Sequence, residues 1–172
     1  MAGSLVKIDE EIVSSAVADV TLTGIDSTYD VYLLTLNNVS PATVNADVFL
    51  RVTESGTASS DSDYDFSFKQ LRTDTTFSNV NNTNQAQFPL SGSLENEAGK
   101  TFNGVCYIFN ANNSSEYTFI TTENGYLADD GTFLGNQGGG VYTQTTTVDG
   151  VNISFDTGNI DAGNFMLYGL KK

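Results

Sequence analysis

The chain contains no histidine. The side chains considered for chemistry are therefore its carboxylates, its hydroxyls and one cysteine. Histidine is the commonest general base and the commonest metal ligand, so its absence argues against Ser–His and Cys–His nucleophile pairs. Cys106 stands between Val105 and Tyr107 in an apolar run, where burial would raise its pKa. We therefore expect a buried structural thiol, with no catalytic residue and no cofactor.

Glycoside hydrolysis is the one reaction that two carboxylates could perform without histidine, provided that they lie at a fixed separation. No motif singles out such a pair, and the chain has no tryptophan on which a sugar could stack. We interpret the acids as solvated side chains and expect the protein not to be an enzyme. The carboxylates considered are Asp61, Asp63, Asp65, Glu95, Glu97, Asp129 and Asp130.

The alternating acids Asp61, Asp63 and Asp65 resemble the first ligands of a calcium-binding loop. The rest of that loop is missing, since Phe66 stands where a glycine is needed and Arg72 where a bidentate glutamate should be. Two interpretations stay open, a simple loop that enters a strand and a less regular calcium site. No metal ligand is assigned.

The glycine-rich stretch GNQGGG, residues 135–140, lacks the Lys-Ser/Thr of a phosphate-binding loop. It is typical of a flexible turn or of a point where another backbone approaches closely. Residues 73–87 and 122–140 are predicted to be long polar loops, which are often functional or interfacial.

The net charge of −14, from 21 acidic and seven basic side chains, should repel phosphate backbones and anionic lipid surfaces. Nucleic acid and membranes are therefore not expected as partners. No stretch approaches the 18 or so apolar residues of a membrane span, and the first residues do not predict a signal peptide.

The elements that must position these side chains are predicted to be β-strands. Thr, Ser, Asn and Gly dominate the polar residues, and alternation is clear in 46–56 and 63–71. Residues 8–20 also fit a helical stripe, but two short strands are favoured at this end of the chain. Nine or ten strands in a single all-β domain, residues 1–172, are expected, with Asp149-Gly150 as a hairpin signal. The other predicted strands lie at 29–39, 104–113, 117–122, 141–147, 151–155 and 165–170.

The last predicted strand is apolar on both faces, since Phe165, Met166, Leu167 and Tyr168 follow one another directly. We expect it inside a sheet, with one face on the core and the other under a loop or a neighbouring subunit. Gly169 would let another backbone approach closely.

Several stretches resemble small virion proteins of marine and cyanobacterial tailed phages. They are SLVKIDEEIVSS, STYDVYLLTLNNVSP, the strand FLRVTESG, SDYDFSF and VDGVNISFDTGNIDAGNFMLYGLKK. The resemblance runs from about Ser4 to Lys172, and GNIDAGNFMLYGL is its most distinctive piece. It implies an antiparallel two-sheet sandwich of jelly-roll-like form, and it carries over no catalytic residue.

The resemblance also implies a non-enzymatic virion structural protein, made in the host cytoplasm and assembled on the phage particle. Display on the capsid exterior as a decoration, knob or head-fibre subunit is the expected role. Its expected partners are other virion proteins, either the major capsid protein or a tail protein, and further copies of itself. The alternative is a tail- or fibre-associated adhesin that binds host glycans through 73–87 and 122–140.

Overall fold

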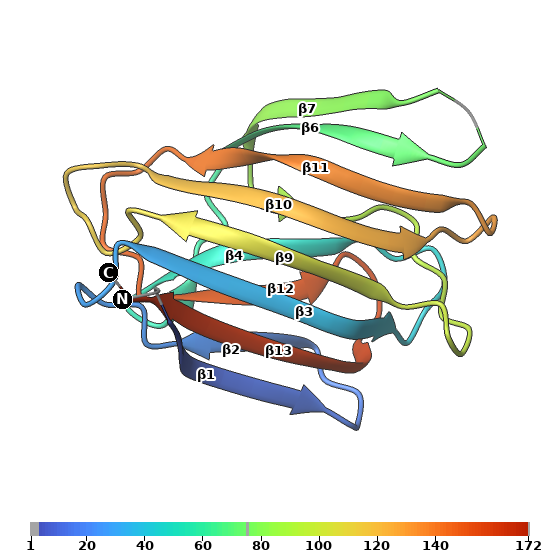
Figure 1. Ribbon diagram of the computed structural model, residues 1–172, viewed down its shortest axis with the longest axis horizontal. Coiled ribbons are helices and arrows are strands. Elements are labelled where there is room, and N and C mark those ends of the chain that lie inside the picture. Colours follow the sequence, from blue (N-terminus) through green and yellow to red (C-terminus); the bar gives the residue numbers. More distant parts are fainter. Residues whose placement is uncertain (1–3, 75, 172) are drawn as a thin grey trace.

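The fold of this chain is a two-sheet antiparallel β-sandwich, which confirms the predicted fold class. A computed structural model describes residues 4–74 and 76–171, and no helix occurs among them. The large sheet lies in front of the small sheet in Figure 1, with both chain ends at one side.

The large sheet contains eight strands and the small sheet four, with a further short strand at the edge of the small one. The large sheet has the spatial order β1 (Leu5–Val13), β13 (Ile160–Leu170), β3 (Val31–Pro41), β9 (Phe102–Phe109), β10 (Thr118–Leu127), β11 (Phe133–Tyr142), β6 (Tyr64–Arg72) and β7 (Ser78–Gln85). The small sheet has the order β2 (Asp19–Thr23), β12 (Gly150–Phe155), β4 (Val48–Glu54) and β5 (Thr57–Ala58), and β8 (Phe88–Pro89) also pairs with β4.

The core fills the space between the two sheets and follows from the period-two alternation of their strands. Leu34 and Leu36 of β3 and Leu50 and Val52 of β4 belong to this core, and all four are fully buried. Each such side chain contributes roughly 1.5–3 kcal/mol by leaving water, which is why the alternation determines which face of each strand turns inward.

The C-terminal strand β13 lies between β1 and β3, as its apolar sequence predicted. Phe165 and Leu167 are fully buried in the core, while Met166 and Tyr168 on the other face are half-buried. The close approach at Gly169 differs from expectation, because a side chain there would meet the ring of Tyr29 rather than a backbone.

The first residues form the two strands β1 and β2, and the helical alternative is wrong. Strands β3, β4, β6, β9, β10, β12 and β13 also lie close to the stretches predicted for them. The Asp149-Gly150 hairpin is wrong, since β12 pairs with β2 and β4 instead of with residues 141–147. The Asp149 carboxylate accepts hydrogen bonds from Thr53 Oγ1 at 2.6 Å and Gly56 N–H at 2.8 Å.

Both predicted long loops are largely strand. Residues 122–140 contain the end of β10 and most of β11, and the stretch 135–140 is extended backbone that pairs with β6 throughout and with β10 from residue 137 onward. Of the predicted strand 141–147, only the first two residues belong to β11. Residues 78–85, inside the other predicted loop, form the edge strand β7. Residue 75 of that loop lies outside the described residues.

The large sheet is wider than the small one. In Figure 1, β2, β12 and β4 lie behind β13, β3 and β9, whereas β6 and β7 extend beyond them. The segment that carries β8 lies under this overhanging part and is hydrogen-bonded to the large sheet, and it positions the cleft described next.

Candidate functional site

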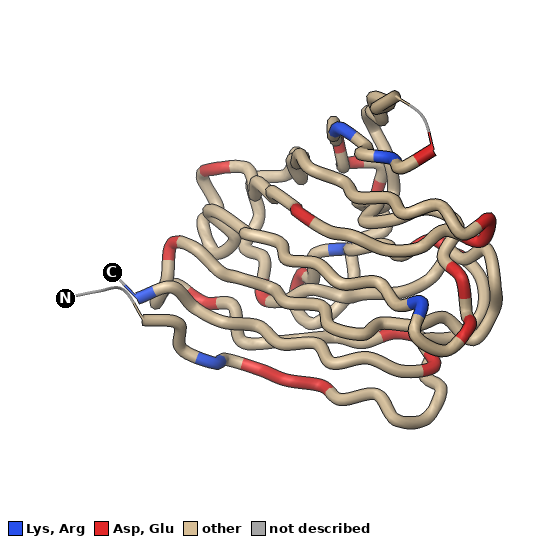
Figure 2. Tube along the Cα trace, turned by 45° about the vertical axis from the view of Figure 1, so that its right-hand side comes forward, with Lys and Arg blue, Asp and Glu red and all other residues tan. Residues whose placement is uncertain are grey.

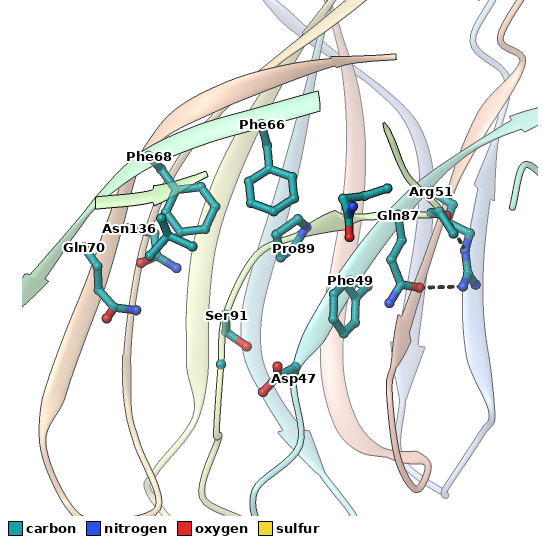
Figure 3. A pocket seen from close by; sticks show the side chains of 14 residues that line it. Asp47, Phe49, Arg51, Phe66, Phe68, Gln70, Gln87, Pro89, Ser91 and Asn136 are labelled. Carbon is teal, nitrogen blue, oxygen red and sulfur yellow. Dashed lines mark hydrogen bonds between the residues drawn. The ribbon is translucent and has the colours of Figure 1, made fainter. Parts of the chain in front are cut away.

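A hollow with converging polar side chains lies under the overhanging part of the large sheet. It is a cleft of about 500 Å³, within the roughly 300–1,000 Å³ typical of small-molecule sites. Figure 3 shows it from close by. Its lining residues are Asp47, Phe49, Arg51, Phe66, Phe68, Gln70, Val80, Gln85, Ala86, Gln87, Pro89, Ser91, Gly92 and Asn136.

One wall of the cleft is aromatic and comes from β6. The rings of Phe66 and Phe68 stack with centroids 5.6 Å apart and planes 20° from parallel. They point toward Pro89 and Phe49, which belong to the opposite wall (Figure 3). Phe49 lies on the face of β4 that turns away from the core and is half-buried. The cleft therefore offers apolar surfaces on two sides.

Glycines in β11 make room for this aromatic wall. A Cβ atom on Gly140 would meet the backbone carbonyl oxygen of Asp65 first, and it would also lie 2.7 Å from Cε2 of Phe88 and 3.0 Å from Cβ of Phe66. Real Cβ atoms do not approach other atoms this closely, so only glycine fits.

The flexible-turn interpretation of 135–140 is wrong, because this stretch is a packed strand. The alternative, a close approach of another backbone, is confirmed, since a Cβ atom on Gly139 or Gly140 would meet the carbonyl oxygen of Ile120 or Asp65.

The opposite wall is fixed to the large sheet by side-chain amides. Asn136 Nδ2 and Asn124 Nδ2 both donate to the carbonyl oxygen of Leu90, each at 2.9 Å. Gly92 N–H donates to the hydroxyl of Tyr126 at 3.0 Å, and burial raises the pKa of Tyr126. The segment that follows β8 is therefore held in place rather than free to close the cleft.

Asn136 lines the cleft with an unused acceptor. Its side chain is only 2% exposed, and its Oδ1 accepts no hydrogen bond from the described residues. An unpaired buried acceptor costs about 1–3 kcal/mol, so native proteins rarely keep one without a partner.

Two charged groups border the cleft. Asp47 Oδ1 accepts a hydrogen bond from Ser93 N–H at 2.5 Å, yet burial raises the pKa of this carboxyl. Arg51 donates from Nε to the carbonyl oxygen of Ala86 at 3.3 Å and from Nη2 to Gln87 Oε1 at 2.5 Å. None of the ion pairs found among the described residues involves Arg51.

A second candidate surface is the face of the large sheet that turns away from the small sheet, which we call the outer face. The registers align Val31, Phe109, Phe119 and Val141 in one row across β3, β9, β10 and β11. Tyr168, Leu33 and Tyr107 stand in the neighbouring row. Beside Phe119, where Gly139 has no side chain, lies a hollow of about 450 Å³.

The outer face carries most of the exposed apolar side chains. Of the ten large hydrophobic residues that are exposed in the described parts of the chain, the strand registers place seven on it. In Figure 2, acidic positions lie mainly along β1 and in the loops, and the central strands are mostly uncharged. The seven residues are Leu5, Ile12, Leu71, Tyr107, Phe119, Phe133 and Leu170.

The structure separates the carboxylates that the sequence singled out. Asp61, Asp63 and Asp65 lie at or just before the start of β6, and Asp129 and Asp130 lie in the β10–β11 turn beside its other end. These ends are about 26 Å apart along the strand. Glu95 and Glu97 instead share Lys100, at 3.4 and 2.8 Å. None of these carboxylates lines the cleft, although Asp65 borders the hollow beside Phe119.

The possible calcium ligands do not converge. Asp65 Oδ1 accepts a hydrogen bond from Asn84 N–H at 2.8 Å. Among the described residues no group of three or more acidic or cysteine side chains could hold a metal ion. Cys106 is buried as predicted, and burial raises the pKa of its thiol to about 12. Within 4–74 and 76–171 there is also no helix of the length and apolarity needed to cross a membrane.

Sequence reasoning missed the cleft residues Asn136, Gln87 and Phe49. Asn136 and Gln87 lie in the predicted loops 122–140 and 73–87, and Phe49 lies within the predicted strand 46–56. One signal was available, because Phe49 interrupts the otherwise polar side of a regular alternation in β4.

Comparison of this chain with protein-family models, with curated proteins and with solved structures finds no match.

Proposed function

We propose that the protein is a non-enzymatic virion structural protein that attaches to the exterior of a phage capsid through its outer face. The observation that carries the proposal is the row of Val31, Phe109, Phe119 and Val141, which runs unbroken across four central strands. An apolar, aromatic surface of this kind is typical of the centre of a protein interface.

The size of the outer face suits such an attachment. Five strands of about ten residues, from β13 to β11, cover roughly 800 Å² at about 4.8 Å between strands and 3.3 Å per residue. That is close to the about 800 Å² that each partner contributes to a standard protein interface. The sequence resemblance to phage virion proteins supports the capsid as the partner.

The negative charge of the chain should limit non-specific association and so favours attachment through the outer face alone. The chain carries a net charge of −14, and its acids lie mainly at β1 and in the loops. Copies of the protein should therefore repel one another outside the outer face and stay soluble until they assemble.

Purified particles provide the test. Mass spectrometry of gradient-purified phage should detect the chain at a fixed stoichiometry to the major capsid protein. The double variant Tyr107→Asp with Phe119→Asp should fold and fail to join particles, while Phe77→Asp, an exposed loop aromatic, should still join. Absence from wild-type particles, or incorporation of the double variant at the normal level, would exclude the proposal.

A second candidate function is a tail- or fibre-associated adhesin that binds host glycans. The loops predicted to bind glycans are largely strands, because residues 78–85 and most of 122–140 belong to β7, β10 and β11. The cleft is therefore the observation that favours this function.

A further inference from the structure

We propose that the cleft under β6 binds a neutral oligosaccharide. One sugar ring lies between the two apolar walls, and its hydroxyls form hydrogen bonds with the amide side chains of the cleft and with Asp47. This inference rests on the second candidate function and is independent of the outer face. A failure at one surface leaves the proposal for the other intact.

The apolar part of the cleft matches the faces of a sugar ring. A pyranose presents C–H groups above and below its plane and hydroxyls around its edge. The near-parallel rings of Phe66 and Phe68 line one side of the cleft, and Phe49 and Pro89 lie opposite them (Figure 3). Aromatic faces of this kind bind C–H groups while leaving the ring edge to polar partners.

The polar part of the cleft can both donate and accept hydrogen bonds. Asn136 Oδ1 is an acceptor without a partner among the described residues, and it is buried. Asp47 Oδ2 and Gln87 Nε2 also make no hydrogen bond to the described part of the chain, since Ser93 N–H binds Oδ1 and Arg51 binds Oε1 instead. A hydroxyl can donate to the first two and accept from the third, which a purely apolar ligand cannot do.

The charges favour an uncharged ligand. The cleft contains one carboxylate, Asp47, and one guanidinium, Arg51. The guanidinium already donates to Gln87 and to the Ala86 carbonyl, and the whole chain carries −14. An acidic or sulfated chain would meet the repulsion of that charge with little compensation.

An extended peptide fits the cleft less well. Strand addition requires a row of backbone N–H and C=O groups along the binding surface. At the wall formed by β8, Pro89 has no N–H, and the carbonyl oxygen of Leu90 already accepts two amide hydrogens. Side-chain recognition of a hydroxyl-rich ligand is what this wall can provide.

Binding to an immobilised oligosaccharide array tests the inference with the full chain. The neutral probes are glucan, mannan, galactan, rhamnan and N-acetylglucosamine chains, and the acidic probes are uronic acid and sulfated chains. We expect binding to at least one neutral probe. Phe49→Ala and Gln87→Ala should each weaken it by about tenfold or more, the size of effect expected when a stacking or hydrogen-bonding partner is lost.

The matched controls change the same residue types on the outer face. Phe119→Ala and Gln137→Ala should leave oligosaccharide binding unchanged, and thermal unfolding should show that all four variants are folded. Three results would overturn the inference: no neutral probe is bound at millimolar protein, only acidic probes are bound, or folded Phe49→Ala and Gln87→Ala bind as the parent does.

Discussion

The two halves of the inner face of the large sheet have the same alternating pattern, but they differ in how fully their inward side chains are buried. In β3 and β13 the inward side chains, such as Leu34 and Leu167, are fully buried against the small sheet. In β6 and β11 the inward side chains include Phe66 and Asn136, which line the cleft. The small sheet covers part of this second half, where Tyr64 and Tyr142 join the core, and beyond it the inward side chains line the cleft instead.

The comparison teaches that an inward position is not by itself a core position. Alternation assigns a side chain to one face of a strand, but a core requires a second layer opposite that face. Where the second layer ends, stacked phenylalanines and amides can lie side by side at a solvent-accessible cleft.

The covered half should be the most sensitive to a buried charge. Leu167→Asp places a carboxylate in the core without a partner, and we expect a loss of about 4 kcal/mol or more in the free energy of unfolding. Asn82→Asp, at an exposed position of β7, should change it by less than about 0.5 kcal/mol. Urea denaturation measures both, and equal tolerance of the two would show that the β13 face is not a core.

The overhanging half should be sensitive to added volume at its glycines. Gly140→Ala would press a methyl group against Phe88 and Phe66, and we expect a loss of about 1–3 kcal/mol in unfolding free energy. Gly92→Ala is the control, because a Cβ atom there would lie 3.6 Å from Asp47 Oδ1, an ordinary contact. A Gly140→Ala protein as stable as the parent would mean that β11 is not packed as described.

The carboxyl of Asp47 should make stability depend on pH in a defined direction. Burial raises its pKa above 3.8, so the folded protein keeps a proton that the unfolded chain has already released. Its contribution to stability is complete below the unfolded pKa and is lost as the pH rises through the folded pKa. Asp47→Asn should therefore gain more stability over the parent at about pH 7 than at about pH 3.

Asp130 provides a control of opposite sign. Hydrogen bonds from Thr132 lower its pKa, so its contribution is present at neutral pH and lost in acid. Asp130→Asn should lose more stability at about pH 7 than at about pH 3. Thermal melts of both variants across this range decide the matter, and a difference from the parent that does not vary with pH would contradict either assignment.

The smallest effect on stability is expected on the outer face. Phe119 is 47% exposed and its chain neighbour Ile120 is 1% exposed, because they point to opposite faces of β10. Phe119→Asp should change the free energy of unfolding by no more than about 0.5 kcal/mol, whereas Ile120→Asp should prevent stable folding. Similar losses in both melts would mean that something covers the outer face within the chain.

The strands with strong alternation or a continuous apolar run could be predicted from sequence, among them β4, β6 and β13. Strand β7 could not, because residues 78–85 have no apolar alternation and extend mainly through backbone pairing with β6. Strand β11 was not predicted for a related reason, because its glycines have no side chains and therefore show no alternation. The cleft was missed with them, because Asn136 lies in one and Gln87 follows the other.

The sequence by itself determined the β class, the face of each alternating strand and the burial of Cys106, since hydrophobicity and period-two geometry act locally. The absence of histidine restricted the chemistry in the same way. Only the tertiary structure decided that glycines 138–140 pack beside Phe66 and Phe68, and that Asn136 meets the segment after β8. Those outcomes depend on which strands become neighbours and on where the small sheet ends, and both are set by the packing of distant segments against one another.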